Sequence, residues 1–257
     1  MTVAPESLNS SAITLFLDVD GTLLEIRDNP ADVIADNELI VLLRACSEKL
    51  GGALSLISGR SIAEVDRIFA PAIFPVAGAH GAEHRFGIGT VSFADARAMP
   101  DDVLSTLERF VVDNDGLLLE RKRGGVSLHY RGAPGLAREC QRLVAELMPV
   151  LGDAFRVIAG KMVLEIAPAG QNKGVAIQRF LERKPFAGRL PVFVGDDVTD
   201  EDGFREVIKR GGTAIRVGDI ESSVAQYRLP NVAAVRPWLN DAILGPVTKN
   251  NDKEHTR

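Results

Sequence analysis

Two carboxylates stand at the end of an apolar run near the start of the chain. Residues 13–23 read ITLFLDVDGTL, so Asp18 and Asp20 come directly after five apolar or β-branched residues. Two like charges about 4 Å apart repel by ~4 kcal/mol even at an effective dielectric of about 20. A second acidic group, made of Asp196, Asp197 and Asp200, lies in GDDVTDED at 195–202. If both groups meet at one site, a cation must offset their repulsion, and ligands that are all oxygens favour Mg²⁺.

Other residues near these motifs have the polarity that a phosphate group requires. The amides of the DGT turn, including those of Gly21 and Thr22, the Ser58 hydroxyl and Lys173 in QNKG each offer a donor or a positive charge. An ionised aspartate can attack phosphorus when a metal and a lysine offset the charge of the phosphate. We therefore expect Asp18 to be the nucleophile and Asp20 to act first as general acid and then as general base.

Each acidic motif also has a simpler explanation when it is taken alone. A DxDG sequence is compatible with a turn, and GDD with a helix cap. A calcium loop does not fit, because Gly203 at its sixth position would make Val198 and Lys209 the first and twelfth residues.

A zinc site is a further alternative at HGAEH, residues 80–84. This sequence matches the H-x-x-E-H signature of zinc proteases, which requires both histidines on one face of a helix. The glycines before, inside and after the motif make such a helix unfavourable. We therefore do not expect a zinc protease.

The pattern of apolar runs predicts the elements that must position these residues. Short apolar strands alternate with helical periodicity in two separated parts of the chain. We expect strands at 13–18, 53–57, 73–77, 191–195 and 213–217, and helices from about 36 and at 61–69, 173–183 and 201–209. Such an alternation is typical of an α/β fold with a Rossmann-like parallel sheet covered on both faces. Ligands bind beyond the carboxyl ends of such strands, where the DVDGT, SGR and GDD motifs all fall.

The segment from 84 to 168 has a different order of elements. We expect helices at 101–112 and 135–148 and strands at 117–122, 126–131, 155–159 and 162–167, the first two forming an antiparallel hairpin. Alternation along these strands puts apolar residues on one face and polar residues on the other. The polar face carries Glu120, Lys122, Ser127, His129, Arg131, Lys161 and Glu165. It is either a solvated surface or a surface that binds a ligand rich in hydroxyl groups.

The composition limits the class of protein and its partners. The chain has 257 residues, 46% of them hydrophobic, and a net charge of −5. This balance excludes a general basic surface, so we expect no nucleic acid or membrane partner. Cys46 and Cys140 match no metal spacing and are expected to be buried thiols in a reducing compartment, the cytoplasm. We expect a monomer.

The motifs together resemble the haloacid dehalogenase (HAD) superfamily of Mg²⁺-dependent phosphatases. DVDGTL is similar to its first motif, SGR to its second, Lys173 to its third and GDDVTDE to its fourth. Within this superfamily, AGAHGAE, ERKRGGVSLHYR, KMVLEI and GDDVTDEDGF are similar to trehalose-6-phosphate phosphatases. The resemblance implies a HAD core at 10–83 and 169–245, an inserted α/β cap domain at 84–168, and hydrolysis of trehalose 6-phosphate through an aspartyl phosphate.

The resemblance also implies a role for each matched residue. It implies Asp18, the Asp20 carbonyl and Asp196 as metal ligands, with Asp197 and Asp200 in or beside the metal site. Phosphate would be held by Gly21, Thr22, Ser58, Gly59, Arg60 and Lys173, and the disaccharide by Glu120, Lys122, His129, Arg131, Lys161 and Glu165. His80 and Glu83 would lie at a hinge or rim, or merely stabilise a turn, and His84 has no implied role.

Three alternatives remain open from the sequence. The first is a phosphatase for another sugar phosphate, such as sucrose phosphate or mannosyl-phosphoglycerate. The second is a phosphosugar mutase, and the third is a sugar-binding module without catalytic activity.

Overall fold

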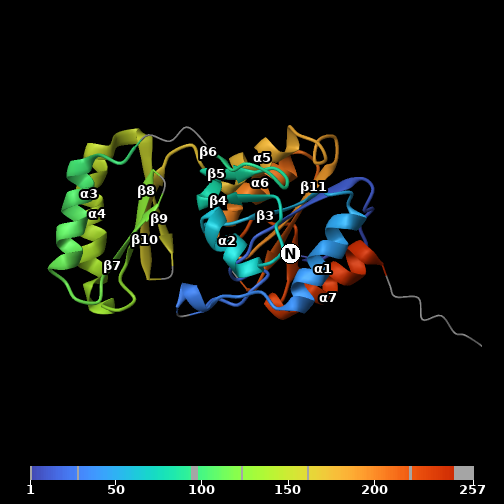
Figure 1. The fold of residues 1–257 in the computed structure, drawn as a ribbon, viewed down its shortest axis with the longest axis horizontal. Coiled ribbons are helices and arrows are strands. Elements are labelled where there is room, and N and C mark those ends of the chain that lie inside the picture. The colour runs from blue at the N-terminus through green and yellow to red at the C-terminus, as the bar shows by residue number, and fades with distance from the viewer. Residues whose placement is uncertain are drawn as a thin grey trace, which may run out of the picture.

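The chain forms a large and a small β-sheet that lie side by side (Figure 1). The computed structural model describes residues 2–27, 29–93, 98–122, 124–160, 162–219 and 222–245. Within these residues, no helix is both long enough and apolar enough to span a membrane.

The large sheet has nine strands and is parallel over most of its width. All pairs from β1 to β4 are parallel, and β5 and β6 add two antiparallel strands at one edge. From edge to edge the strands are β1 (Thr2–Val3), β13 (Tyr227–Leu229), β12 (Thr213–Val217), β11 (Leu190–Gly195), β2 (Ile13–Leu17), β3 (Leu54–Ile57), β4 (Val76–Gly78), β5 (Glu83–Arg85) and β6 (Ser92–Phe93).

Helices cover both faces of this sheet, as the sequence predicts. Helix α1 packs against α7 on one face and α5 against α6 on the other (Figure 1). The helices are α1 (Asn37–Lys49), α2 (Ile62–Phe69), α5 (Lys173–Leu181), α6 (Glu201–Lys209) and α7 (Val235–Leu239). Short 3₁₀ turns are η1 (Pro30–Asp32), η2 (Ala79–Gly81), η5 (Val198–Asp200) and η6 (Val232–Ala234), and a π turn is η7 (Asn240–Leu244). Every residue of β2 and β3 is buried. A continuous apolar sequence predicts such a strand, covered on both faces of the sheet.

Three helices begin where side-chain caps are present in the sequence. Asp36 accepts a hydrogen bond from the Leu39 amide at 2.8 Å, and Ser61 forms a capping box with Glu64. Asn172 caps α5 through the Val175 amide at 2.8 Å, which fixes Lys173 as the first residue of that helix. These bonds satisfy amides that have no partner inside the helix.

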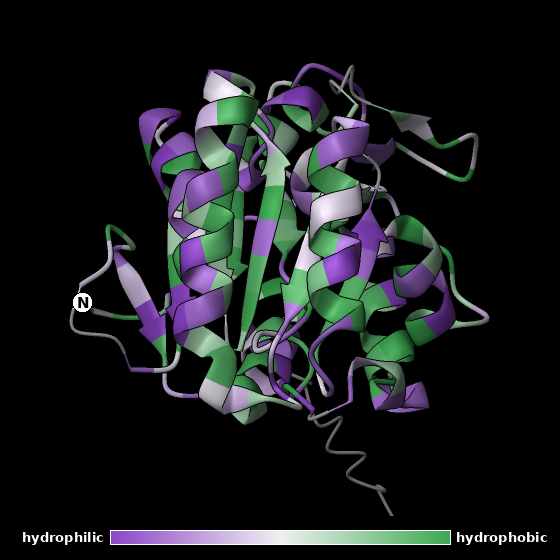
Figure 2. Cartoon of the chain, turned by 90° about the vertical axis from the view of Figure 1, so that its left-hand side faces the viewer, coloured by the Kyte–Doolittle hydropathy of each residue, from purple (hydrophilic) through white to green (hydrophobic). Residues whose placement is uncertain are grey.

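The small sheet carries its own hydrophobic core. Its strand order is β7 (Leu118–Lys122), β8 (Gly125–His129), β10 (Val163–Pro168) and β9 (Phe155–Gly160), and all pairs are antiparallel. The small unit has two helices, α3 (Asp101–Val112) and α4 (Ala137–Leu151). Two 3₁₀ turns, η3 (Pro134–Leu136) and η4 (Gly152–Ala154), flank α4. The helices lie on the side of the small sheet that faces away from the large sheet (Figure 1). In the view from that side, much of their outward surface is hydrophilic (Figure 2).

The predicted apolar face of the small sheet packs on these helices. Val126, Leu128 and Leu164 are buried together with Leu107 of α3 and Val144 of α4. The opposite, polar face therefore looks toward the large sheet across the gap between the two units (Figure 1).

Some boundaries differ from the sequence-based expectation. Helix α5 ends at Leu181 rather than 183. In a helix continued to Pro185, the proline ring would clash with the Leu181 carbonyl four residues earlier. Strand β5 pairs with β4, and β6 pairs with β5. Both strands therefore belong to the large sheet, although all of their residues except Glu83 lie at or beyond residue 84, at which the sequence suggests that the insertion begins. The three-residue strand β5 was not predicted, because a glycine-interrupted run is too short for alternation to be recognised.

Candidate active site

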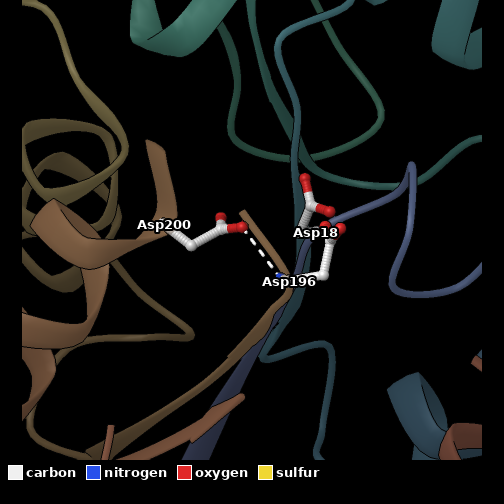
Figure 3. A group of neighbouring side chains, drawn as sticks. All are labelled: Asp18, Asp196 and Asp200. Carbon is white, nitrogen blue, oxygen red and sulfur yellow. Dashed lines mark hydrogen bonds between the residues drawn. The ribbon is translucent and has the colours of Figure 1, made fainter. Parts of the chain in front are cut away.

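The carboxyl ends of three neighbouring strands bring the predicted motifs together. Strand β2 pairs with β11 on one side and β3 on the other. Asp18 follows β2, Ser58 follows β3 and Asp196 follows β11. The side chains of Asp18, Asp196 and Asp200 accordingly gather at one point (Figure 3).

Lys173 occupies the centre of this acidic group. Its Nζ donates to Asp18 Oδ1 at 2.8 Å and to Asp200 Oδ1 at 2.6 Å. All three side chains are buried. A buried charge is tolerated only when it is paired in this way, so the lysine and the two carboxylates depend on one another.

The burial of Asp18 changes its acidity. Burial raises the pKa of Asp18 well above its usual value, Lys173 lowers it, and the charges of Asp200 and Asp196 raise it again. Burial alone would lower the pKa of Lys173, but Asp18 and Asp200 raise it well above its ordinary value. The lysine therefore stays charged, and it pairs with two of the three carboxylates of the cluster.

The donor atoms fit a divalent cation. Asp18, Asp196 and Asp200 each offer a carboxylate oxygen within 4.8 Å of the others, the single such group in the described part of the chain. Asp18 Oδ2 is buried and has no hydrogen-bond partner among the described residues. Gly21, with φ +85°, leaves space for Asp196, since a Cβ there would lie 2.1 Å from its Oδ2. These features are those of a hard-metal site with oxygen ligands.

Asp200 also shapes the loop that carries Asp196. Its Oδ2 accepts hydrogen bonds from the amides of Asp196 at 3.0 Å, drawn in Figure 3, and of Asp197 at 2.9 Å. Buried Arg216 donates to the carbonyls of Asp196 and Asp197 and pairs with Glu201 at 3.1 Å. Sequence analysis did not identify Arg216, although a single arginine within the apolar strand TAIRV was a usable signal.

Two predicted acidic residues lie outside the cluster. The Asp197 side chain is exposed, and its Oδ1 accepts from the Val198 amide at 2.7 Å. The Asp20 carboxylate is held by Arg60, whose Nε and Nη2 donate to its two oxygens at 2.7 Å each. Arg60 Nη1 also donates to the Pro30 carbonyl at 3.0 Å. In this structure the Arg60 guanidinium is thus bound to Asp20, in the same cavity that Lys173 lines.

The other predicted phosphate contacts line the opposite side of the cluster. Thr22 is fully buried, with its hydroxyl 3.5 Å from Asp196 Oδ1. Ser58 is buried, and its Oγ accepts from the Arg60 amide at 3.1 Å. Gly59 lies under the ring of His80, because a Cβ at Gly59 would be 2.7 Å from His80 Nε2.

A cleft between the two sheets opens onto the cluster. A cavity of about 240 Å³ is lined by Asp18, Lys173 and Asp196 from the large unit and by Glu120 and His129 from the small one. It adjoins a cavity of about 850 Å³ between the same units. Sequence analysis did not identify the following lining residues of the larger cavity: Ile26, Arg27, Asn29, Glu64, Arg67, Leu118, Ile158, Val163 and Thr199. Most lie in loops or are apolar residues of the cap strands, where no pattern distinguishes them from ordinary surface positions.

The polar face of the small sheet is connected by hydrogen bonds. Lys122 Nζ and Ser127 Oγ donate to Glu165 Oε2 at 2.6 and 3.1 Å. His129 Nε2 lies 2.9 Å from Glu120 Oε2. This contact lowers the pKa of Glu120, against the effect of burial.

Arg131 and Lys161 are the other two residues predicted on the polar face of the small sheet. Arg131 lines the larger cavity, and its Nη1 lies 3.4 Å from the Arg27 carbonyl of the large unit. Lys161, predicted on the same face, lies outside the described residues.

The HGAEH segment does not form the helix that a zinc protease motif requires. His80 lies in turn η2 with φ 51°, and His84 lies in strand β5. Glu83 Oε2 accepts from the Ile62 amide at 2.7 Å, at the start of α2. This bond joins residues 21 positions apart, so it is not the local turn bond that the sequence left as an alternative for Glu83.

Comparisons with known proteins agree on one family. The sequence profile of the trehalose-phosphatase family matches residues 16–233. A probable trehalose-phosphate phosphatase of Sinorhizobium fredii is 42% identical over 223 residues, covering 86% of this chain and 84% of that protein. Trehalose-6-phosphate phosphatase of Escherichia coli is 38% identical over 242 residues, covering 93% and 89%. The crystal structure of a trehalose-6-phosphate phosphatase related protein superposes with a TM-score of 0.70 at 26% identity, covering 89% of this chain and 96% of that one.

Proposed function

The chain belongs to the trehalose-phosphatase family, and we propose that it hydrolyses trehalose 6-phosphate to trehalose and inorganic phosphate. The observation that carries the proposal is the position of Asp18. Its Oδ2 is buried without a hydrogen-bond partner among the described residues, beside Lys173 and in a cavity roofed by Glu120 and His129. This arrangement supports the proposal, because the proposed nucleophile, the Lys173 ammonium group and the polar residues proposed to bind the sugar all line one cavity.

In the first step, an oxygen of Asp18 attacks the phosphorus atom of the ester. The bond between phosphorus and the sugar O6 breaks, and an aspartyl phosphate forms on Asp18. Lys173, which bonds Asp18 Oδ1, orients the carboxylate and offsets its repulsion by the phosphate. The leaving sugar oxygen takes a proton from Asp20.

In the second step, Asp20 removes a proton from water, which attacks the phosphorus atom and releases phosphate and free Asp18. In this structure each oxygen of Asp20 accepts a hydrogen bond from Arg60, which would oppose transfer of a proton to or from Asp20. We propose that Asp20 leaves this contact when substrate enters and that Arg60 then turns toward the substrate.

We propose Mg²⁺ as the metal. Asp18, Asp196 and the carbonyl of Asp20 would bind it, with Asp200 holding the Asp196 loop and Asp197 beside it. The bound ion would neutralise charge on the phosphoryl oxygens. The cluster of oxygen donors supports Mg²⁺ over a softer metal.

We propose that the unit with strands β7–β10 is a cap domain that selects the sugar. Glu120, Lys122, His129, Arg131, Lys161 and Glu165 would bind its hydroxyl groups. A volume of about 850 Å³ lies in the range of ligand sites and exceeds what a phosphate alone needs. Burial of unpaired polar groups would penalise a sugar of the wrong shape.

We also propose that the protein acts as a monomer in the cytoplasm. Cys46 and Cys140 are both buried and unpaired, which fits a reducing compartment.

The test is release of phosphate, with Mg²⁺, from a panel that contains trehalose 6-phosphate, sucrose 6-phosphate, mannosyl-phosphoglycerate and glucose 6-phosphate. We expect the highest kcat/KM for trehalose 6-phosphate and no detectable release by Asp18→Asn, with the fold retained by circular dichroism. A higher kcat/KM for another member of the panel would show that this other sugar phosphate, and not trehalose 6-phosphate, is the substrate. Formation of an isomerised sugar phosphate without free phosphate would indicate a mutase. If no member of the panel reacts, the protein would instead be a sugar-binding module.

A further inference from the structure

His80 links the two units at the mouth of the site. It belongs to turn η2 of the large unit, and its side chain is buried. Its Nε2 lies 3.6 Å from Oε2 of Glu165, which belongs to the small unit. Glu165 is also bound by Lys122, and Lys122 Nζ in turn lies 3.4 Å from the Gly59 carbonyl of the large unit. The pair Lys122–Glu165 therefore lies directly on Gly59 and His80.

The turn that carries His80 is attached to the segment predicted to bind phosphate. The His80 amide donates to the Ser58 carbonyl at 3.1 Å, and the Ala79 amide to the Arg60 carbonyl at 2.7 Å. The edge of the imidazole ring lies against Gly59, at the place that a Cβ would fill. The imidazole ring and its backbone are thus both in contact with the Ser58–Arg60 segment.

The backbone of this turn is strained. Ala79 has φ 46° and His80 has φ 51°, so two successive residues with a Cβ adopt the left-handed conformation. Residues other than glycine adopt it rarely, and such strain persists where the surrounding structure imposes it. His80 Nδ1 is buried and has no hydrogen-bond partner among the described residues. The ring is therefore positioned by Glu165 and Gly59 and not by bonds on both nitrogens.

The electrostatics of Glu165 agree with this geometry. Burial alone would raise the pKa of Glu165, but His80 and Lys122 lower it to about 2. The carboxylate is therefore ionised at neutral pH and attracts both groups, one from each unit.

We propose that His80 is a positioning residue that holds Glu165, and through it Lys122, over the Ser58–Arg60 segment. His80 would thereby couple closure of the cap to assembly of the phosphate site. The inference rests on the proposed function, because Glu165 and Lys122 are the residues assigned to the sugar. It predicts that loss of the ring weakens recognition of a sugar phosphate more than hydrolysis of a small phosphate ester.

Three substitutions distinguish the effect of losing the imidazole ring from the effect of relieving the backbone strain. His80→Gly relieves the left-handed strain and removes the ring. His80→Asn tolerates the left-handed backbone but is too short to reach Glu165. His80→Gln extends far enough to place a donor near the position of Nε2. Each is assayed with trehalose 6-phosphate and with p-nitrophenyl phosphate, and each is checked by thermal unfolding.

The measured quantity is kcat/KM for trehalose 6-phosphate divided by kcat/KM for p-nitrophenyl phosphate. We expect His80→Gly and His80→Asn to lower this ratio by about tenfold, mainly by raising KM for trehalose 6-phosphate. We expect His80→Gln to restore most of this ratio. In a Glu165→Gln background, His80→Gly should have about threefold further effect or less, because the partner is already altered.

A purely structural role predicts a different result. Both substrates would then lose activity equally, and the effects of His80→Gly and Glu165→Gln would multiply; either result would overturn the proposal. If wild type does not turn over trehalose 6-phosphate, the proposed function fails by itself. The same ratio is then measured with the sugar phosphate of the panel that is hydrolysed fastest, which still decides the role of His80.

Discussion

At the scale of single residues, the site depends on how buried charges are paired. Asp18, Asp200 and Lys173 are buried together, and the lysine alone does not balance the cluster once Asp196 is included. Breaking a buried ion pair typically costs several kcal/mol, which explains why the three groups are held so closely. The remaining negative charge is what a divalent cation would neutralise.

This imbalance predicts that Mg²⁺ stabilises the fold. A ligand that binds only the folded state at about 100 times its Kd adds about 2.7 kcal/mol to the free energy of unfolding. We expect a rise of that order for wild type, measured by urea unfolding with and without saturating Mg²⁺. Asp196→Asn, at a half-buried position, should fold without Mg²⁺ and lose most of the rise. An equal rise in both proteins would place the metal elsewhere.

His84 illustrates a buried residue that is not part of the chemistry. Its ring stacks on Phe86 at 5.6 Å between ring centroids, and Arg179 and Arg183 lie nearby. Burial, together with these two arginines, lowers the pKa of His84 from its ordinary 6.5 to about 4. The ring is therefore neutral in the folded protein at neutral pH.

The lowered pKa predicts a loss of stability in acid. As the pH falls from about 6.5 to about 4, the unfolded chain binds a proton at His84 and the folded chain does not, so the free energy of unfolding decreases. The contribution is on the order of 3 kcal/mol, and it stops growing below about pH 4. We expect His84→Phe to reduce the decrease in this window, measured by urea unfolding at several pH values. Parallel curves for the two proteins would show that His84 does not titrate in this way.

At the scale of elements, strand alternation assigns the two faces of the small sheet. Glu120 and Lys122 of β7 line the cleft side, whereas Arg121 between them pairs with Glu108 of α3 on the other side. The same strand therefore provides a matched pair of positions for a test of sugar recognition.

We expect Glu120→Ala to lower kcat/KM for trehalose 6-phosphate by about tenfold or more and to affect p-nitrophenyl phosphate much less. Arg121→Ala removes an exposed ion pair and should change both activities little. The comparison requires phosphate release for both variants with both substrates. Equal losses on the two substrates in Glu120→Ala would exclude this strand from sugar recognition.

Much of the fold follows from local patterns in the sequence. The buried strands β2 and β11 end at Asp18 and Asp196, and the rule for carboxyl ends of parallel strands was enough to bring these aspartates together. The helix starts near Asp36 and Ser61 were likewise predicted, and both residues cap their helices.

Features that depend on distant contacts were not predictable. The contact of Arg60 with Asp20 joins residues 40 positions apart in the chain, and His80 reaches Glu165 across the cleft. Neither has a periodicity or a spacing that a sequence pattern would reveal. The left-handed backbone at Ala79 and His80 was also not predicted, because residues other than glycine adopt this conformation rarely.

At the scale of the whole molecule, contacts between the two units occur at several places around the cleft. Near the linker at 169–171, Arg156 of β9 donates to the Gln171 carbonyl at 2.9 Å and lies 3.6 Å from Asp202 of α6. Lys122 and Glu165 contact Gly59 and His80, and Arg131 approaches the Arg27 carbonyl. Closure of such a cleft around a substrate would exclude water from the phosphate site until Asp20 activates a water molecule.

The proposed function depends most on a covalent bond that Asp18 forms to phosphorus during turnover. The most direct measurement is an acid quench of the enzyme during turnover of trehalose 6-phosphate, followed by borohydride reduction and peptide mass spectrometry. Reduction converts an aspartyl phosphate to homoserine, and we predict homoserine at position 18 in wild type and none without substrate. Homoserine at position 20 or 196, or no modification during active turnover, would contradict the account.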